Sequence, residues 1–248
     1  MADAIFAERR LAEVYDPLDP DRSDLDVYAA MVDEFGAQRV LDIGCGTGTF
    51  ACLLARRGLP VTAVDPAAAS LEIARTKPGA DRVRWVRGYA ADLPPLQVDL
   101  VTMTGNVAQV FLTDAEWAAT LRAAYAALAP GGRLVFETRD PAARAWLEWN
   151  RDRSYRRTVV PGVGAIQAWE DLLDVSGELV SFRSTVVFET DGAVLTSEST
   201  LRFRHRDEVT ASLAAEGYVV DEVRQAPDRP GRELVFIARR ADEGATGM

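Results

Sequence analysis

Five consecutive residues, Gly44-Cys45-Gly46-Thr47-Gly48, form the segment best suited to hold a small ligand. Three alternating glycines allow positive φ angles and leave backbone that a ligand can contact directly. Asp42 precedes the segment, where a carboxylate suits a ligand with an ammonium group and hydroxyls better than one with a pyrophosphate. A helix predicted to begin near Thr49 would direct its N-terminal amide groups at the same ligand. The segment therefore predicts a site for a ligand that carries an ammonium group and hydroxyls.

Two further positions extend this site along the edge of a predicted parallel sheet. Asp65 follows the strand predicted at residues 61–64, about 20 residues after the glycines, where an acid can bind ribose hydroxyls. Its alternative role is that of a helix N-cap. Thr104, Gly105 and Asn106 end or follow the strand predicted at residues 98–104. Because ligands of open parallel sheets bind outside the carboxyl ends of the strands, we expect these three residues to border the reacting centre.

The stretch Val40-Leu41-Asp42-Ile43-Gly44-Cys45-Gly46-Thr47-Gly48 resembles the first motif of class I S-adenosylmethionine-dependent methyltransferases. Its G-x-G-x-G spacing after an acid differs from the G-x-G-x-x-G of dinucleotide sites. The resemblance implies that S-adenosylmethionine is the cofactor and S-adenosylhomocysteine the product. It also implies that Asp65 binds the adenosine ribose, and that Asp92 and Leu93 hold the adenine, with the carboxylate accepting from its exocyclic amine.

The resemblance further implies a lid over the cofactor. In many proteins of that family a leading segment with a Tyr-Asp pair folds over the cofactor, and Tyr15 is the matching residue here. The alternative is a surface aromatic residue in a proline-rich loop. We expect no metal site. The residues expected to bind the cofactor are Tyr15, Asp42, Gly44, Cys45, Gly46, Thr47, Gly48, Asp65, Pro66, Asp92, Leu93, Thr104, Gly105 and Asn106.

Alternating strands and helices must position these residues. Apolar periodicity and helix-capping signals predict a helix at residues 7–14, broken at residues 15–20 by Pro17 and Pro20, and a second at 24–35. With two strands near the C-terminus, we expect a Rossmann-like, doubly wound α/β sheet of seven strands, the seventh antiparallel. The predicted strands are 40–43, 61–64, 83–88, 98–104, 133–138, 218–223 and 233–239, with further helices at 67–76, 113–128 and 207–216.

Residues 139–204 do not continue the alternation of strands and helices, and their pattern predicts an inserted antiparallel β meander. Alternating segments at 155–160, 165–173, 179–189 and 193–203 are separated by turn pairs. We expect residues 1–138 and 205–240 to form the cofactor-binding domain, and the meander to pack beside the main sheet as a substrate or lid subdomain. The resembled family places substrate specificity there, which makes Trp146, Trp149, Trp169 and Arg183 candidate substrate contacts.

His205 is the only histidine of the chain and lies where the meander returns to a helix. A histidine at such a junction can serve as a general base. Its alternative role is that of a partly exposed residue at a strand end. His205 is therefore a weak catalytic candidate, and the sequence identifies no other.

Charge and composition limit the kinds of molecule that the protein is expected to bind. The chain has 248 residues, a net charge of −10 and 48% hydrophobic residues. An acidic chain argues against general nucleic-acid binding, which needs Lys and Arg at phosphates. No apolar run approaches the ~20 residues of a membrane span, and residues 1–5 show no secretion signal. Cys45 and Cys52 are poorly spaced for a disulfide, so we expect reduced thiols and a cytoplasmic protein.

These observations predict in-line methyl transfer from S-adenosylmethionine to a small-molecule acceptor, with neither nucleic acid nor membrane as partner, by a monomer or homodimer. The sulfonium already activates the methyl group, so the protein mainly supplies alignment and desolvation. A base is needed only when the acceptor must lose a proton before attack. Two alternatives stay open: a non-catalytic protein that binds S-adenosylmethionine, and an NAD-dependent oxidoreductase, which the glycine spacing and Asp42 disfavour.

Overall fold

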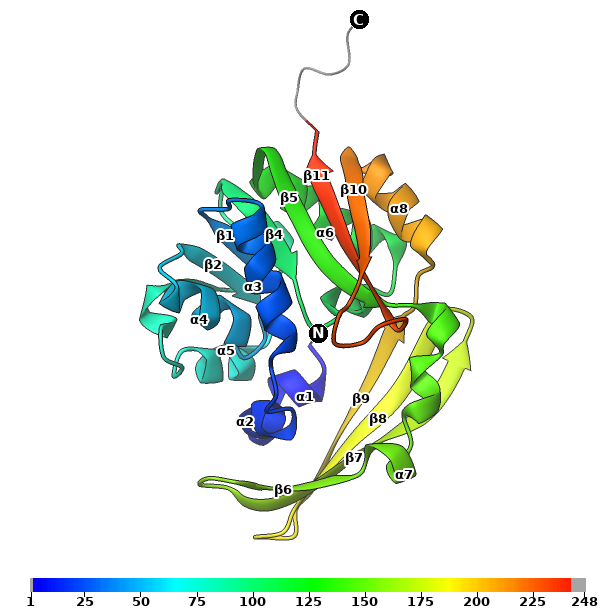
Figure 1. Cartoon of the computed structure of the whole chain (residues 1–248). Coiled ribbons are helices and arrows are strands. Elements are labelled where there is room, and N and C mark those ends of the chain that lie inside the picture. Colours follow the sequence, from blue (N-terminus) through cyan, green and yellow to red (C-terminus); the bar gives the residue numbers. More distant parts are fainter. Residues whose placement is uncertain (1, 242–248) are drawn as a thin grey trace, which may run out of the picture.

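The computed structural model describes residues 2–241 and contains two β sheets, with helices around the larger one (Figure 1). The larger sheet has the strand order β10-β11-β5-β4-β1-β2-β3. Strands β1 to β5 are parallel, and β11 runs antiparallel to both of its neighbours. This is the predicted seven-stranded Rossmann-like sheet. Its strands are β1 (Val40–Ile43), β2 (Val61–Asp65), β3 (Val83–Arg87), β4 (Val98–Met103), β5 (Leu128–Arg139), β10 (Tyr218–Gln225) and β11 (Glu233–Arg240).

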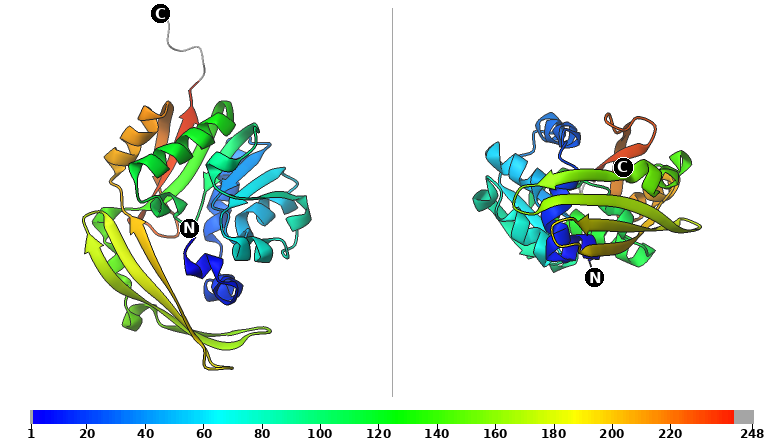
Figure 2. Two further views of the ribbon diagram at one scale, coloured as in Figure 1. Left: turned by 180° about the vertical axis from the view of Figure 1, so that it is seen from behind. Right: turned by 90° about the horizontal axis from the view of Figure 1, so that it is seen from below.

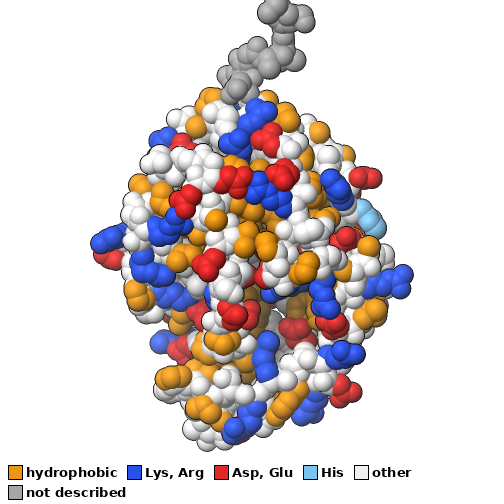
Figure 3. All heavy atoms as spheres, in the orientation of Figure 1, with side chains coloured by type: hydrophobic (Ala, Val, Ile, Leu, Met, Phe, Trp, Pro, Cys, Tyr) orange, Lys and Arg blue, Asp and Glu red, His pale blue; other side chains and the backbone are white. Residues whose placement is uncertain are grey.

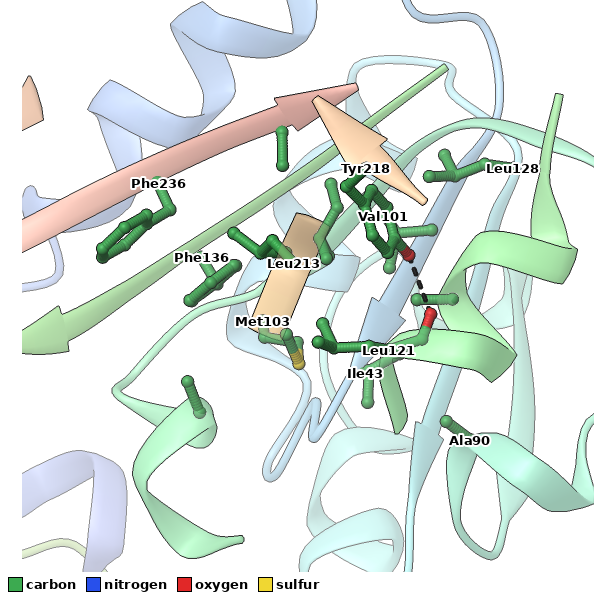
Figure 4. Close-up of a cluster of buried hydrophobic side chains, with 14 of the residues drawn as sticks. Ile43, Ala90, Val101, Met103, Leu121, Leu128, Phe136, Leu213, Tyr218 and Phe236 are labelled. Atoms are coloured by element: carbon green, nitrogen blue, oxygen red, sulfur yellow. Dashed lines mark hydrogen bonds between the residues drawn. The ribbon is translucent and has the colours of Figure 1, made fainter. Parts of the chain in front are cut away.

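Helices cover both faces of this sheet, which explains why its central strands are apolar on both sides. On one face α3 (Asp24–Glu34) and α4 (Thr49–Arg56) pack on alternate residues of the strands. On the other face α6 (Asp114–Ala127) and α8 (Arg206–Ala215) do the same, while α5 (Ala68–Ala74) follows β2. Figure 4 shows part of the second core, where the Tyr218 hydroxyl donates to the Leu121 carbonyl at 2.8 Å. Both cores fix the strand ends that carry the candidate site.

The smaller sheet is the predicted meander. Its strands are β6 (Arg156–Val160), β7 (Gly164–Ser176), β8 (Leu179–Phe188) and β9 (Val194–Arg202), paired antiparallel in chain order. Short helical turns connect it to β5: η4 (Pro141–Ala143), η5 (Ala145–Glu148) and α7 (Arg151–Ser154). Figures 1 and 2 show this sheet lying across the end of the molecule that faces the carboxyl ends of the parallel strands. The insertion therefore lies on the side of the candidate site.

Two N-terminal helices, α1 (Ala4–Ala7) and α2 (Arg9–Leu18), lie between the two sheets (Figure 1). The prediction of a break at residues 15–20 was wrong at its start, because α2 continues through Tyr15 and ends at Leu18, with Pro17 in its last turn. A proline there removes one amide donor and leaves the preceding turns intact. Burial of Leu11 and Val14 favours the helix over the break that local propensity suggests.

The apolar face of the meander packs on α2, whereas the sequence predicted packing beside the main sheet. Leu11 and Val14 of α2 contact Val160, Ile166 and Phe188 of the meander. The same N-terminal segment also contacts α5, since the Ser70 hydroxyl donates to the Phe6 carbonyl at 2.9 Å. The two helices are thus a layer that joins the meander to the larger sheet. Among residues 2–241, no helix is long and apolar enough to cross a bilayer.

Candidate functional site

The glycine segment forms the predicted turn between β1 and α4. Gly44, Gly46 and Gly48 all have positive φ angles, of 71°, 52° and 75°. A Cβ atom on Gly44 would lie 2.6 Å from Val107, and one on Gly48 would lie 2.5 Å from the Trp85 ring. A Cβ on Gly46 would meet nothing within 4 Å. Gly44 and Gly48 therefore allow close packing, and Gly46 leaves open space in which a ligand can approach the backbone.

Two buried acids flank this turn, and we call the turn with Asp42 and Asp65 the glycine-turn site. Asp42 is 1% exposed, and its Oδ1 accepts from the Thr102 hydroxyl at 2.9 Å. Its Oδ2 is buried and has no hydrogen-bond partner among residues 2–241. Burial raises the pKa of Asp42 to about 7. A buried acceptor without a partner is costly, so this oxygen favours a ligand that donates a hydrogen bond.

Asp65 ends β2 and holds the glycine turn in place. Its Oδ2 accepts from the Gly46 N–H at 2.8 Å, and its Oδ1 accepts from the Ala67 N–H at 2.8 Å. The N-cap of α5 is Ala67, so Asp65 does not take the capping role that was its alternative. Burial raises the pKa of Asp65 above its ordinary value. Each carboxylate oxygen can still accept another hydrogen bond, as binding of ribose hydroxyls requires.

The other predicted cofactor residues lie at the same edge of the sheet. Asp92 follows β3 and is exposed, with its Oδ2 accepting from the Tyr89 N–H at 2.8 Å. Leu93 packs against the core beside it. Pro66 follows β2, and Thr104 follows β4. Cys45, within the turn, and Cys52, in α4, are both free thiols.

Helix α2 is tied to the glycine turn by Asp16. The Asp16 carboxylate accepts from the Thr47 hydroxyl at 2.7 Å and pairs with the Lys77 ammonium at 2.5 Å. Lys77 is the only lysine in the sequence, and its ammonium also donates to the Thr49 hydroxyl at 2.6 Å. The neighbouring Tyr15 packs against the Phe6 ring. Burial raises the pKa of the Tyr15 phenol.

A cavity of about 610 Å³, counted into its open mouth, lies beneath α2, and we call it the lid cavity. Figure 3 shows that the molecule is hollowed between its two parts on this face, with acidic and basic side chains around the opening. The lining residues are Tyr15, Asp16, Asp19, Arg22, Asp24, Tyr28, Gly105, Asn106, Glu137, Arg139, Asp228, Arg229 and Glu233.

Asn106 and Glu137 form the wall of the lid cavity next to the sheet. Asn106 has a φ of 62°, and its backbone N–H donates to Glu137 Oε1 at 2.7 Å. Its side-chain Nδ2 donates to Glu233 Oε1 at 3.2 Å. Within the described part of the chain, neither Asn106 Oδ1 nor Glu137 Oε2 has a partner in hydrogen-bonding geometry. Burial raises the pKa of Glu137 to about 7, although the Asn106 N–H and the Tyr28 hydroxyl lower it.

Arginines balance the acids on the outer side of this wall. Arg229 Nη1 lies 2.9 Å from Glu233 Oε1, and Arg139 Nε lies 3.8 Å from the same oxygen. Arg139 also donates to Gln109 Oε1 at 2.9 Å. Arg139, Arg229 and Glu233 line a second hollow too, which continues towards Trp149 and Arg153. The lid cavity and this hollow therefore adjoin each other.

The four residues predicted to contact substrate lie in different places in the structure. Only Trp149 lines either of these two cavities. Trp146 packs edge-on against Phe203, Trp169 donates to Asp171, and Arg183 pairs with Glu198. His205 is exposed at the N-cap of α8 and lines neither cavity.

Sequence reasoning did not identify Tyr28, Glu137 and Glu233 of the lid cavity as site residues. It predicted only a helix at residues 24–35 and a strand at residues 133–138 for the first two. A usable signal was present, since Glu137 directly follows the apolar residues 134–136, just as Asp65 ends an apolar strand. Glu233, at the start of β11, carried no local signal.

Comparisons with known proteins agree with this geometry. The family described as "Methyltransferase domain" matches residues 40–132. The amino pentose methyltransferase CalS10 from Micromonospora echinaspora, solved with S-adenosylmethionine bound, is 26% identical with a TM-score of 0.67, over 90% of this chain and 93% of that one. The chain carries a class I S-adenosylmethionine-dependent methyltransferase domain. This domain includes the glycine-turn site and the strands on either side of it.

Two other proteins show how far the similarity extends. A methyltransferase structure from Clostridium acetobutylicum shares the fold at a TM-score of 0.75, with 16% identity over 94% of this chain and 98% of that one. The ubiquinone/menaquinone biosynthesis C-methyltransferase of Rubrivivax gelatinosus is 32% identical over 143 residues, or 56% of this chain and 53% of that protein. The chain spans about half the length of the curated relatives it matches.

Proposed function

We propose that the protein transfers the methyl group of S-adenosylmethionine to a small-molecule acceptor. The proposal rests on one observation, the lid cavity that is lined by the Gly105–Asn106 segment and by α2. The cavity therefore reaches the segment assigned to the sulfonium end, where a methyl acceptor has to bind. The amino pentose and quinone methyltransferases among the similar proteins support a small-molecule acceptor.

The glycine-turn site fits the chemical groups of the cofactor. The unpartnered Asp42 Oδ2 suits a hydrogen-bond donor, and the open space at Gly46 lets a ligand reach the backbone. We assign the ribose hydroxyls to Asp65, the adenine to Asp92 and Leu93, and the sulfonium end to Thr104, Gly105 and Asn106. The lid is assigned to Tyr15. The remaining assigned contacts are Gly44, Cys45, Gly46, Thr47, Gly48 and Pro66.

The bound cofactor would supply a methyl group that its sulfonium already activates. The protein then has to align the acceptor with that methyl group and keep water away. Helix α2 performs the second task, because Asp16 holds it on Thr47 and Lys77 above the turn. The acids of both sites favour a positively charged ligand through their combined negative field.

The test is a methyl-transfer assay in which release of S-adenosylhomocysteine is measured with small amines, alcohols and phenols as acceptors. We expect release that depends on one of these acceptors. Binding of S-adenosylmethionine with no release for any acceptor would favour a non-catalytic binding protein. Binding of NAD in place of S-adenosylmethionine would favour an oxidoreductase.

A further inference from the structure

Two buried residues in the wall of the lid cavity each have a side-chain oxygen that lacks a hydrogen bond among the described residues. Asn106 is 5% exposed and Glu137 is 3% exposed, and both line the cavity. Within residues 2–241, Asn106 Oδ1 has no hydrogen-bond partner, and Glu137 Oε2 has none at hydrogen-bond distance, although the Tyr28 hydroxyl lies near enough to lower the pKa of Glu137. The two residues are neighbours, because the Asn106 backbone N–H donates to the other Glu137 oxygen at 2.7 Å. The unpartnered Asp42 Oδ2 belongs to the glycine-turn site, since Asp42 does not line the lid cavity.

These two hydrogen-bond acceptors favour some methyl-accepting molecules over others. A buried acceptor is stabilised when a ligand donates a hydrogen to it. A hydroxyl has a single hydrogen and can satisfy one of the two atoms, whereas an amine or ammonium nitrogen has two or three N–H donors. An amine nitrogen therefore has enough donors for both Asn106 Oδ1 and Glu137 Oε2. A carbon nucleophile offers neither atom a strong donor.

The position of the pair relative to the sheet also suits the reacting nitrogen. Asn106 follows β4, and Glu137 lies near the end of the adjacent β5. The glycine turn follows β1, on the other side of β4. The pair thus lies beside the strand ends at which the sheet order changes direction, where ligands of such sheets react.

We propose that the lid cavity binds an amine acceptor between Asn106 and Glu137, and that the Glu137 carboxylate removes the proton that must leave before the nitrogen attacks. The proposal rests on the methyltransferase function proposed above. Glu137 is then a catalytic residue, and Tyr28 is a positioning residue beside it.

The step balances as follows. An ammonium group enters the cavity and gives one proton to Glu137 Oε2, which frees the nitrogen lone pair. The nitrogen then forms a bond to the methyl carbon as the carbon–sulfur bond breaks, and that bond's electron pair stays on sulfur. The products are S-adenosylhomocysteine and an N-methylated ammonium, and Glu137 later loses its proton to solvent. No oxidant or metal is needed.

The surroundings of Glu137 suit a group that takes and releases a proton. Burial raises its pKa to about 7, and the negative charge of Glu233, from β11, acts in the same direction. The Tyr28 hydroxyl from α3 and the Gly105 and Asn106 amides lower the pKa. The charge of Glu137 acts to raise the pKa of Asp42, from β1. It also acts to raise the pKa of Arg139, which lies on β5 with Glu137. A carboxyl balanced near neutrality is suited to general base work.

The first test compares matched acceptors. Primary amines and the alcohols of the same carbon skeleton are incubated with the protein and S-adenosylmethionine, and release of S-adenosylhomocysteine is measured. We expect methylation of amines and none of the matched alcohols. Turnover of the alcohols with none of the amines would overturn the proposal, while leaving the methyltransferase function intact.

The second test uses Glu137→Gln, which keeps the size of the side chain and an oxygen for the Asn106 N–H. We expect kcat to fall about 10²–10⁴-fold and the acid limb of the pH–rate profile to disappear. The affinity for S-adenosylhomocysteine should stay within about twofold. Tyr28→Phe should keep most of the activity and move the acid limb to higher pH, because Tyr28 lowers the pKa of Glu137. Full activity in Glu137→Gln, or a loss of cofactor affinity comparable to the loss in kcat, would overturn the assignment.

A third measurement needs no acceptor. Infrared difference spectra of the native protein with S-adenosylhomocysteine, recorded across neutral pH, should show a buried carboxylic acid that titrates near neutrality. The signal should be smaller in Glu137→Gln, where Asp42 is the remaining buried carboxyl with a pKa raised to about 7, and unchanged in Glu34→Gln, an exposed carboxyl at the end of α3 that pairs with Arg224. The same signal in both variants would assign the proton to another group and contradict the proposal. This readout stays informative even if no acceptor is methylated.

Discussion

The glycine-turn site and the lid cavity are both lined by buried acids, but they are assembled in different ways. Asp42, Gly46 and Asp65 come from one strand–helix–strand unit, and the Gly46 N–H donates to Asp65 within it. Tyr28, Asn106, Glu137 and Glu233 come from four segments that are far apart in the sequence. The first arrangement lies within residues 40–132, which match the methyltransferase-domain family, and the second can change with any of its segments. The comparison suggests that the first site binds the cofactor and the second determines the acceptor.

The largest effect should come from removing the carboxylate of the glycine-turn site. Asp65→Ala loses the hydrogen bonds to the ribose and releases the Gly46 N–H. Hydrogen bonds to a charged group contribute about 1.5–3 kcal/mol each, so the affinity for S-adenosylhomocysteine should fall about tenfold or more. Calorimetric titration measures it. An unchanged affinity would remove Asp65 from the ribose site and weaken the contrast between the two regions.

The pH dependence of the free energy of unfolding should reveal the raised pKa of Glu137 in the lid cavity. Because the pKa of Glu137 is raised to about 7 in the folded protein, the folded state binds this proton more tightly than the unfolded state does. Its contribution to stability is therefore fully present below the unfolded pKa and is lost as the pH rises through about 7, by on the order of 3 kcal/mol. Glu137→Gln should lose less stability than the native protein between about pH 5 and about pH 9.

Chemical denaturation at both pH values measures this difference, and Glu34→Gln is the control. Asp42, whose pKa is also raised to about 7, produces a similar slope in every variant. Equal slopes for the native protein and Glu137→Gln would mean that Glu137 keeps an ordinary pKa.

Some of the residues in these predictions could be identified from the sequence, and others could not. The strand order and the glycine turn follow from short-range patterns, since apolar strands and alternating glycines occur within a single unit of the chain. The meander was also predictable, because its turn pairs separate alternating segments. The lid cavity was not, because it depends on β11 placing Glu233 beside β5 and on α3 turning Tyr28 towards Glu137.

The end of α2 is a second feature that the sequence alone did not predict. Local rules ended it before Tyr15, because two prolines follow. The structure extends it to Leu18, because Leu11 and Val14 are buried against a meander more than 140 residues further along the chain. Only with this extension does Asp16 reach Thr47 and Lys77. Long-range packing therefore decided the element that covers both sites.

A smaller effect is expected at the contact that joins the two regions. Asp16→Asn weakens the pair with Lys77, whose two side chains are only 27% and 19% exposed. We expect a loss of about 1–2 kcal/mol, and S-adenosylhomocysteine should dissociate about tenfold faster because α2 opens more often. Stopped-flow displacement measures the rate. Lys77→Arg, which keeps the charge, should change it far less, and an equal change in both variants would contradict the role of the ion pair.

The smallest effect is expected at His205. Its ring is exposed at the start of α8 and lines neither cavity, so His205→Asn should leave kcat and the pH–rate profile unchanged within about twofold. Steady-state assays across pH check this. Loss of a limb of the profile in this variant would restore His205 as the base and displace Glu137.

The division of roles between the two regions can be tested most directly by calorimetric titration of S-adenosylhomocysteine into the native protein, Asp65→Ala and Glu137→Gln. We predict tight binding to the native protein, an affinity lower by about tenfold or more in Asp65→Ala, and an affinity within about twofold of the native value in Glu137→Gln. Equal weakening in both variants would mean that the lid cavity holds the cofactor, and would contradict the account.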